Sequence, residues 1–276
     1  MTDRYAVIGH PVEHSLSPAI HAEFARVTGG DVSYGRILAP LDGFRAAALR
    51  FRDEGGKGLN VTLPFKPEAW QLADSHSAGA AAAGAVNTLK FEGGRIAGHN
   101  TDGIGLANDL RGNLGCPVRG RRVLLMGAGG ASYGVMEPLL RELPLSLIVA
   151  NRTEEKAKAL IGHFEKLSAE LGIRRFTWLP YDRLENGPFD IVINATSAGL
   201  TDAMPPLPRR VFASGALAYD MVYGRTTPFM KFAAGCGAEV ADGLGMLVEQ
   251  AAESFYIWRD VRPATKAVIA RLRSGQ

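Results

Sequence analysis

The sequence predicts a protein of the α/β class, and three observations lead to that prediction. Short apolar runs that suit strands alternate with longer segments that have helical periodicity. A glycine cluster at 127–130 joins one such run, residues 123–126, to a helix-compatible segment, and a second apolar run at 145–150 follows that segment. Strand, glycine turn, helix and strand in this order are typical of a doubly wound parallel sheet.

The expected elements cover most of the chain. Strands are expected at 5–9, 32–38, 84–89, 95–98, 123–126, 145–150, 175–179, 190–194 and 217–223, with a short strand and glycine turn at 239–246. Helices are expected at 19–27, 41–52, 77–83, 106–114, 154–171, 246–258 and 263–273.

Length and composition suit a folded protein of one large or two modest domains. The chain has 276 residues, of which 46% are hydrophobic and 21% charged, and its formal net charge is +3. Its basic clusters are short and lack interleaved aromatic residues, so a nucleic-acid partner is not expected. The two cysteines lack metal-ligand spacing and suit a reducing compartment, so we expect no metal site. We see no signal peptide and no apolar run of about 20 residues, and expect a soluble cytoplasmic protein without a membrane partner.

The glycine turn predicts a nucleotide-binding site. Glycine is needed where the backbone turns tightly and its N–H groups approach a pyrophosphate, because a Cβ would block both. The candidate residues are Gly127, Ala128, Gly129, Gly130 and Ala131. The spacing departs from G-x-G-x-x-G, since Ala or Ser stands where the third glycine would fall. Ser132 could cap the next helix or reach a phosphate oxygen, and a turn without any ligand is the alternative.

The end of the next strand predicts NADP rather than NAD. Folds that bind NAD usually carry Asp or Glu here, to bind the 2′-hydroxyl of the ribose. In this chain the strand runs into Asn151, Arg152 and Thr153, with Lys156 soon after and no carboxylate before Glu154. A guanidinium suits a 2′-phosphate, which it can grip with two hydrogen bonds. The alternative is a solvated arginine at a strand end.

Lys66 and Asp102 are candidates for acid–base chemistry. Lys66 follows a strand in a turn that two prolines restrict, and the strand's alternation puts Asn60 and Thr62 on one face. Asp102 follows another strand and is the natural partner for the lysine. An ordinary solvated lysine and an ordinary turn or helix-cap residue are the alternatives. Earlier in the chain, Ser17 is expected to cap the first helix, although its hydroxyl and that of Ser15 could instead hold a carboxylate.

Nine local motifs follow one another along the chain. They are S-L-S-P at 15–18, N-V-T-L-P-F-K at 60–66, A-V-N-T at 85–88, G-H-N-T-D at 98–102, G-A-G-G-A-S at 127–132, N-R-T at 151–153, N-A-T-S at 194–197, D-M-V-Y at 220–223 and G-L-G-M-L-V-E-Q at 243–250. Together and in this order, they resemble the shikimate dehydrogenase family. The departures are small: Ala22 stands where the family often has a polar residue, and position 99 varies within the family.

The resemblance implies a domain organisation and a reaction. It implies an N-terminal α/β substrate domain over 1–104, a Rossmann-type NADP domain over 105–245, and C-terminal helices over about 246–276 that return to the first domain. The implied reaction is reversible, NADP-dependent reduction of 3-dehydroshikimate to shikimate, in aromatic amino acid biosynthesis. The implied partner is a small-molecule substrate, with either a monomer or a homodimer as the assembly.

The resemblance also implies roles for individual residues. Ser15 and Ser17 would bind the substrate carboxylate, and ring hydroxyls would be bound by Thr62, Asn87 and Gln250, with Asn60 and Tyr223 nearby. Thr196, Ser197, Met221 and Gly243 would join the glycine turn and the second strand end in binding the cofactor.

Lys66 and Asp102 would flank the reacting oxygen, where a cation or proton donor stabilises the negative charge that hydride addition creates. Lys66, Asp102 or a water could take the hydroxyl proton in oxidation. His10, His14 and His99 lie close to the motifs and are interpreted as structural or rim residues rather than competing acids.

Two alternatives to this function remain open. One is a broader quinate/shikimate dehydrogenase, a relative that often uses NAD, which Arg152 argues against. The other is a non-catalytic NADP-binding sensor that kept the fold.

Overall fold

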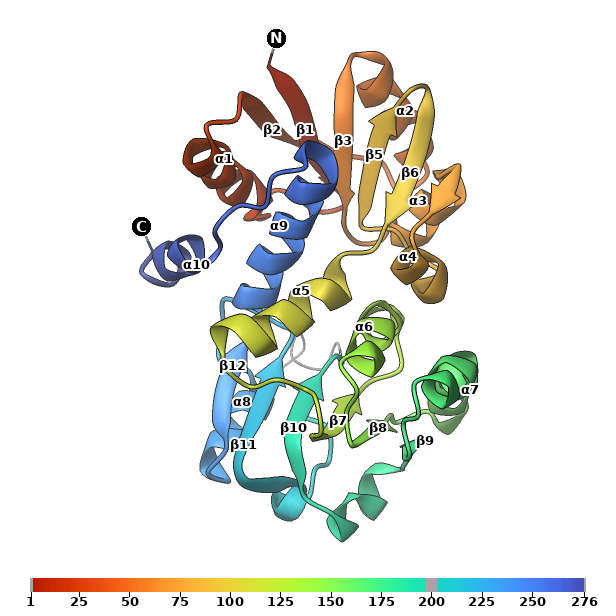
Figure 1. Ribbon diagram of the computed structural model, residues 1–276, viewed down its shortest axis with the longest axis vertical. Coiled ribbons are helices and arrows are strands. Elements are labelled where there is room, and N and C mark those ends of the chain that lie inside the picture. Colours follow the sequence, from red (N-terminus) through yellow and green to blue (C-terminus); the bar gives the residue numbers. More distant parts are fainter. Residues whose placement is uncertain (1, 197–202, 276) are drawn as a thin grey trace. The chain divides into compact units, whose positions relative to one another are not determined.

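The computed structural model describes residues 2–196 and 203–275, apart from the side chains of Glu185 and Asn186 (Figure 1). The chain forms two compact units. We call the residues up to Gly105, together with those from Leu247 onward, the N-terminal unit, and Leu106–Met246 the central unit. Each unit has its own six-stranded sheet with helices packed on it, which confirms the predicted α/β class.

The N-terminal unit is built on a mixed sheet. Its elements are β1 (Asp3–Gly9), α1 (Ser17–Thr28), β2 (Val32–Leu38), α2 (Phe44–Asp53), β3 (Gly56–Val61), α3 (Lys66–Leu72), β4 (Ser75–His76), α4 (Ala78–Ala83), β5 (Thr88–Glu92), β6 (Arg95–His99) and α10 (Lys266–Arg273). The strand order is β2-β1-β3-β5-β6-β4. β1 is parallel to both its neighbours, whereas β5 is antiparallel to β3 and β6. β5 and β6 therefore form a hairpin.

The C-terminal helices contribute to the core of the N-terminal unit. α9 (Leu244–Arg259) carries the chain into this unit, and α10 follows it. Ile20 and Phe24 of α1 form one buried cluster with Phe255 of α9 and Val268 of α10. Burial of large apolar side chains such as these contributes about 1.5–3 kcal/mol each, so the helices are held firmly.

The central unit is a doubly wound parallel sheet. Its elements are β7 (Arg122–Met126), α6 (Gly130–Arg141), β8 (Ser146–Ala150), α7 (Glu154–Glu170), β9 (Phe176–Trp178), a 3₁₀ helix (Tyr181–Asn186), β10 (Phe189–Asn194), a second 3₁₀ helix (Arg209–Val211), β11 (Phe212–Asp220), α8 (Pro228–Gly235) and β12 (Glu239–Asp242). The strand order is β9-β8-β7-β10-β11-β12, and every pair is parallel (Figure 1). Numbered along the chain this is 3-2-1-4-5-6, the Rossmann order, which confirms the predicted fold.

The central strands explain why the sequence shows continuous apolar runs. The residues from Val123 to Met126 and all of β8 are buried. Strands covered by helices on both faces need apolar residues at every position rather than at alternate ones. Phe229 of α8 packs in one cluster with Leu124 and Val192 of the sheet. No helix in the described ranges is long and apolar enough to cross a membrane.

Several element boundaries differ from the expectation, and the differences near the candidate site matter most. Ser17 is the first residue of α1 rather than its cap, because Leu16 takes the capping position without a side-chain bond. The expected 106–114 helix begins earlier, as α5 (Asp102–Asn108), and ends in a π-helical turn over Asp109–Asn113. The buried Asp109 carboxylate in this turn accepts a hydrogen bond from the Tyr219 hydroxyl at 2.7 Å. The expected 84–89 strand begins only at Thr88.

Candidate active site

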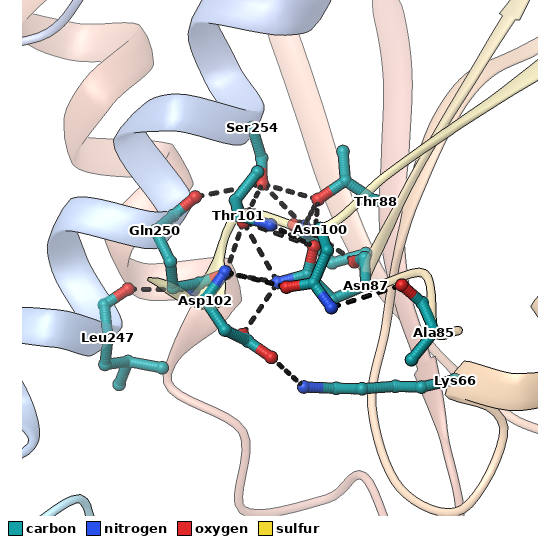
Figure 2. Close-up of polar contacts among 11 residues, drawn as sticks. Lys66, Ala85, Asn87, Thr88, Asn100, Thr101, Asp102, Leu247, Gln250 and Ser254 are labelled. Atoms are coloured by element: carbon teal, nitrogen blue, oxygen red, sulfur yellow. Dashed lines mark hydrogen bonds and ion pairs between the residues drawn. The ribbon is translucent and has the colours of Figure 1, made fainter. Parts of the chain in front are cut away.

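Lys66 and Asp102 form an ion pair in the N-terminal unit (Figure 2). Each is the first residue of a helix, Lys66 of α3 and Asp102 of α5. Lys66 Nζ lies 2.5 Å from Asp102 Oδ2, and the two side chains are 27% and 15% exposed. Nδ2 of Asn87 donates to the other carboxylate oxygen at 2.8 Å. Asp102 thus accepts on both oxygens, an arrangement that suits a carboxylate beside a protonated amine.

The Asn87 carboxamide links the ion pair to α9. Its Oδ1 accepts from the backbone N–H of Thr101 at 2.9 Å, which determines that Nδ2 faces Asp102. Gln250 of α9 places Oε1 3.4 Å from Asn87 Nδ2, while its Nε2 donates to the Leu247 carbonyl at 2.8 Å. The structure therefore brings together four of the predicted site residues, which are Lys66, Asn87, Asp102 and Gln250 (Figure 2).

Asn60 does not contact the ion pair directly, and both the oxygen and the nitrogen of its amide form hydrogen bonds with other protein groups. Its Oδ1 accepts from the Tyr34 hydroxyl at 2.7 Å, and its Nδ2 lies 3.1 Å from Thr88 Oγ1 and 3.0 Å from Ser254 Oγ. Asn60 is buried. It therefore supports the other polar residues, and its expected place near the substrate stays a prediction.

Thr62 follows β3, Ser15 lies in the loop after β1, and Ser17 begins α1. The methyl group of Thr62 lies close to Gly9, because a Cβ added to Gly9 would lie only 2.3 Å from that methyl group. The hydroxyls of Ser15 and Ser17 lie 3.2 Å apart, and Ser15 Oγ accepts from the Ser17 N–H at 3.3 Å. Two adjacent hydroxyl donors suit a carboxylate. Burial raises the pKa of the neighbouring Tyr34 well above its ordinary value, and a hydrogen bond with Ser17 lowers it in part.

Among the nearby histidines, two have structural surroundings. Nδ1 of His10 lies 2.9 Å from the Ala39 carbonyl. Burial lowers the pKa of His99, and the charge of Lys90 lowers it further. A histidine that is neutral near pH 7 is a poor general acid, which supports the structural interpretation of His99.

The candidate cofactor residues follow the last residues of neighbouring strands in the central unit. The ends of β8, β7, β10, β11 and β12 lie in one row of the sheet; they are Ala150, Met126, Asn194, Asp220 and Asp242. The predicted residues stand one or two positions further on: Asn151, Gly127, Thr196, Met221 and Gly243. The carboxyl edge of a parallel sheet is where open α/β folds bind ligands, and the strand order reverses here between β7 and β10.

The glycine turn between β7 and α6 leaves backbone donors free. Gly127 has φ 107°, and a Cβ there would lie 3.0 Å from the Ala195 carbonyl oxygen. Gly129 occupies the N-cap of α6, and no side chain caps the helix, so the alternative of Ser132 as a cap is wrong. Ser132 Oγ is buried and has no hydrogen-bond partner within the described ranges. Uncapped N–H groups beside an unpaired hydroxyl fit a phosphate group.

Two basic side chains follow β8, Arg152 in the turn after it and Lys156 in the first turn of α7. Arg152 and Lys156 are exposed, and no carboxylate in the described part of the chain forms an ion pair with either. Burial raises the pKa of Tyr181 to about 12, although the charge of nearby Arg152 lowers it in part. Asn151 Nδ2 donates to the Thr153 carbonyl at 2.8 Å and shapes this turn. The two cations are available for an anionic ligand such as a 2′-phosphate.

A buried aspartate organises the ends of β10 and β11. Asp220 accepts from the Thr227 hydroxyl at 2.5 Å, from Asn194 Nδ2 at 3.1 Å and from the Val222 N–H at 3.0 Å. Oδ1 of Asn194 in turn accepts from the hydroxyl of Thr196 at 2.7 Å. These bonds fix the backbone on which Thr196 and Met221 lie, since buried charge-assisted hydrogen bonds are strong.

Gly243 and Met221 lie in direct contact at the same edge. A Cβ on Gly243 would come within 2.2 Å of the Met221 carbonyl oxygen, so only glycine fits there without a shift. Tyr223 belongs to the central unit, and burial raises the pKa of its phenol. Ser197 lies outside the described residues.

The sequence interpretation assigned no role to several buried polar residues of the site. They are Thr88, Thr101 and Ser254 in the N-terminal unit, and Asn194, Asp220 and Thr227 in the central unit. The half-buried Tyr34 of the N-terminal unit was not assigned a role either. The sequence does contain one indication that Ser254 belongs to the site. Ser254 stands four positions after Gln250 on one helix, which places the two side chains on the same face.

The chain matches known proteins along its whole length. Three family models match it in succession: the shikimate dehydrogenase substrate binding domain at residues 7–89, shikimate / quinate 5-dehydrogenase at 111–201, and the shikimate 5′-dehydrogenase C-terminal domain at 243–273. A protein of Methylobacillus flagellatus named shikimate dehydrogenase (NADP(+)) is 56% identical over 99% of this chain and 100% of its own.

Solved structures agree with this match. An Ael1 enzyme from Pseudomonas putida is 52% identical, with a TM-score of 0.92 over 98% of both chains. The shikimate 5-dehydrogenase of Thermus thermophilus, solved with NADP(H) and shikimate, is 34% identical, with a TM-score of 0.86 over 100% of both chains. The chain therefore belongs to the shikimate dehydrogenase family.

Proposed function

We propose that this protein catalyses the NADP-dependent interconversion of 3-dehydroshikimate and shikimate. The N-terminal unit binds the substrate and the central unit binds NADP(H). The observation that carries the proposal is the ion pair of Lys66 and Asp102, held by Asn87 beside Gln250. Relatives named shikimate dehydrogenase (NADP(+)) are 53–56% identical to the chain over nearly its full length, which supports the same substrate here.

The central unit offers what NADP(H) requires. The uncapped start of α6, with the unpaired Ser132 hydroxyl, suits the pyrophosphate. Arg152 and Lys156 suit the 2′-phosphate, since no acidic side chain competes for them among the described residues. Thr196, Met221 and Gly243, at the carboxyl edge of the sheet, would complete the site, together with Ser197. When bound, the cofactor supplies or accepts the hydride.

Lys66 would stabilise the negative charge that forms on the reacting oxygen. When the ring ketone is reduced, its carbon gains the hydride and its oxygen gains negative charge. A protonated Nζ beside that oxygen stabilises the charge and donates the proton that completes the hydroxyl. Asp102 orients the lysine, because its Oδ2 accepts from Nζ and its Oδ1 from Asn87. In oxidation the hydroxyl proton returns to this pair, either directly or through a water.

The remaining polar residues would orient the ring. Ser15 and Ser17 present two adjacent hydroxyls to the substrate carboxylate. Asn87, Gln250 and Thr62 would bind ring hydroxyls, and Tyr223 is a further candidate for a substrate contact. Such contacts position the ketone and raise the rate by holding the reactants in the productive geometry.

Initial rates of NADP⁺ reduction test the proposal directly. Shikimate with NADP⁺ should give fast reduction, whereas quinate and NAD⁺ should each support much slower rates. Comparable rates with quinate or with NAD⁺ would assign the chain to the broader quinate/shikimate dehydrogenases. No turnover in any combination, despite tight NADPH binding, would support the non-catalytic sensor.

Replacement of Lys66 with Ala tests the catalytic role. We expect kcat to fall by at least about 10²-fold, the usual contribution of a general acid, while NADPH affinity stays within about twofold. The affinity is retained because the proposed cofactor contacts come from the central unit. Turnover near the wild-type rate would show that Lys66 is not the proton donor.

The cellular compartment is proposed on a separate observation. Cys116 and Cys236 are both free thiols. Unpaired cysteines are typical of a reducing compartment, so we propose the cytoplasm.

A further inference from the structure

The carboxamide of Asn87 receives three hydrogen bonds on one oxygen. Oδ1 accepts from the Thr101 N–H at 2.9 Å, the Thr88 hydroxyl at 2.9 Å and the Thr101 hydroxyl at 3.2 Å (Figure 2). Its Nδ2 donates to Asp102 at 2.8 Å. If the amide turned over, a carbonyl oxygen would face the Asp102 carboxylate, and two acceptors in contact repel each other. The donors on Oδ1 therefore decide whether Asn87 can hold Asp102.

The Thr88 hydroxyl is itself oriented by Ser254. The two hydroxyl oxygens lie 2.8 Å apart, and both side chains are fully buried. Thr88 Oγ1 donates to Asn87 Oδ1 and is in hydrogen-bond contact with Ser254 Oγ. Ser254 Oγ also accepts from Asn60 Nδ2 at 3.0 Å and donates to the Gln250 carbonyl at 3.0 Å.

A continuous series of polar contacts leads from Tyr34 to Asp102. The Tyr34 hydroxyl donates to Asn60 at 2.7 Å, and Asn60 donates to Ser254. Ser254 Oγ contacts Thr88 Oγ1, Thr88 donates to Asn87, and Asn87 donates to Asp102. Burial raises the pKa of Tyr34, which keeps its phenol protonated and able to start the chain. Connected hydrogen bonds in a buried environment polarise and strengthen one another.

We propose that Thr88 and Ser254 are positioning residues that hold Asn87, and through it Asp102 and Lys66, in the reactive geometry. Neither hydroxyl is exposed, so they act through Asn87 rather than on the substrate. Ser254 ties this function to α9, the helix that also supplies Gln250. The inference rests on the proposed role of the Lys66–Asp102 pair.

Substitution of the two hydroxyls tests the inference. We measure the single-turnover rate of NADPH oxidation by 3-dehydroshikimate, because this rate reports the chemical step. Thr88→Val keeps the shape but removes the donor, and Ser254→Ala removes the second hydroxyl. Each should lower the rate about tenfold while NADPH affinity stays unchanged, and Thr88→Ser should restore at least half of the wild-type rate. Ser168→Ala, a buried serine of α7 in the central unit, is the matched control and should leave the rate unchanged.

A double-mutant cycle separates positioning from general destabilisation. In an Asn87→Ala background, Thr88→Val should lower the rate by less than about twofold, because the group that Thr88 holds is gone. A full tenfold loss in that background would overturn the inference, as would single variants that react within twofold of wild type. If Thr88→Val does not fold, the same comparison is made with Ser254→Ala and Ser254→Cys, each in the wild-type and the Asn87→Ala background.

Failure of this inference differs from failure of the proposed function. If Thr88→Val and Ser254→Ala are fully active while Lys66→Ala is inactive, the catalytic pair stands and the hydroxyl pair does not position it. If Lys66→Ala itself remains active, the role of the pair is wrong, and the positioning inference falls with it.

Discussion

Arg152 is the single residue on which the choice between the two dinucleotides depends most. Its guanidinium is exposed at the end of β8, and no carboxylate in the described ranges forms an ion pair with it. Replacement with Ala should weaken NADP⁺ binding by about 10–100-fold, since charge-assisted bonds to a phosphate contribute about 1.5–3 kcal/mol. NAD⁺ has no 2′-phosphate, so its affinity should change little. Titration of both cofactors by fluorescence or calorimetry measures the difference.

The control for Arg152 is another exposed arginine of the central unit. Arg174→Ala removes the same charge away from the strand ends and should leave both affinities unchanged. Equal losses of NADP⁺ and NAD⁺ affinity in Arg152→Ala would disprove the 2′-phosphate assignment.

His21 makes the stability of the N-terminal unit depend on pH. It is fully buried, its ring stacks on Tyr34 with centroids 4.2 Å apart, and neither ring nitrogen has a hydrogen-bond partner in the described part of the chain. Burial lowers its pKa from 6.5 to about 3. Between about pH 6.5 and 3, His21 is therefore protonated in the unfolded state but neutral in the folded state. The resulting stability is complete above pH 6.5 and is lost as the pH falls through this window.

The prediction for His21 is a difference in pH slope. Between pH 7.5 and pH 5, the wild type should lose about 2 kcal/mol more unfolding free energy than His21→Phe, which keeps an aromatic ring but cannot be protonated. Urea titrations at the two pH values measure this loss. His14→Gln, at an exposed histidine, should keep the wild-type slope. Parallel curves for wild type and His21→Phe would refute the assignment of a neutral buried imidazole.

At the scale of elements, one ion pair joins the starts of two central strands. Arg122 opens β7 and Asp190 lies at the start of β10; the guanidinium donates to both carboxylate oxygens, at 3.1 and 2.7 Å. The backbone N–H of Arg122 adds a third bond, at 2.8 Å. The side-chain hydrogen bond from Arg122 is the main cause that lowers the pKa of Asp190, although burial raises it in part.

Asp190→Asn tests how much this junction stabilises the central unit. Because the folded pKa is lowered, the stabilisation is present above the unfolded pKa of about 3.9 and disappears as the pH falls through the folded value. At pH 7 we expect a loss of about 1 kcal/mol or less, since Arg122 is 40% exposed and solvent screens the pair. The difference from wild type should vanish near pH 2. A constant difference across this range would show that the loss is not electrostatic.

The elements also show which parts of the structure local sequence can reveal. The runs at β7 and β8 and the intervening glycine turn were predicted because a strand covered on both faces and a tight turn each restrict residue types locally. The early start of α5 was not predicted, and neither was its π-helical end. The buried Asp109 in that turn meets Tyr219, a residue 110 positions away. Contacts over such separations leave no periodic signal in either segment.

The same distinction holds for the candidate site. The sequence predicts Lys66 and Asp102 as partners because both follow strands and carry opposite charge. The structure places them in contact. The hydroxyls of Thr88 and Ser254 were not assigned, since a buried serine or threonine is ordinary in a core and only its partners reveal the network. Ser17 was expected as a cap and is not one, because Leu16 occupies that position.

At the scale of the whole molecule, the proposed ligands divide between the two units. Every proposed cofactor residue that the structure describes lies in the central unit, and every proposed substrate residue except Tyr223 lies in the N-terminal unit. A ligand stabilises the unit that binds it, by about 2.7 kcal/mol at a hundred times its dissociation constant. Each ligand should therefore slow amide exchange mainly in its own unit.

Hydrogen exchange followed by mass spectrometry tests this division. NADP⁺ alone should slow exchange up to about 100-fold in peptides that cover 122–132 and 146–156, within the central unit. Shikimate alone should do so in peptides that cover 56–66 and 85–102, in the N-terminal unit. Arg152→Ala at the same NADP⁺ concentration should lose most of the first effect and retain the second. Protection by shikimate that is as strong in the central unit as in the N-terminal unit would contradict the assignment, because it would mean that the substrate residues named here are not the ones that bind it.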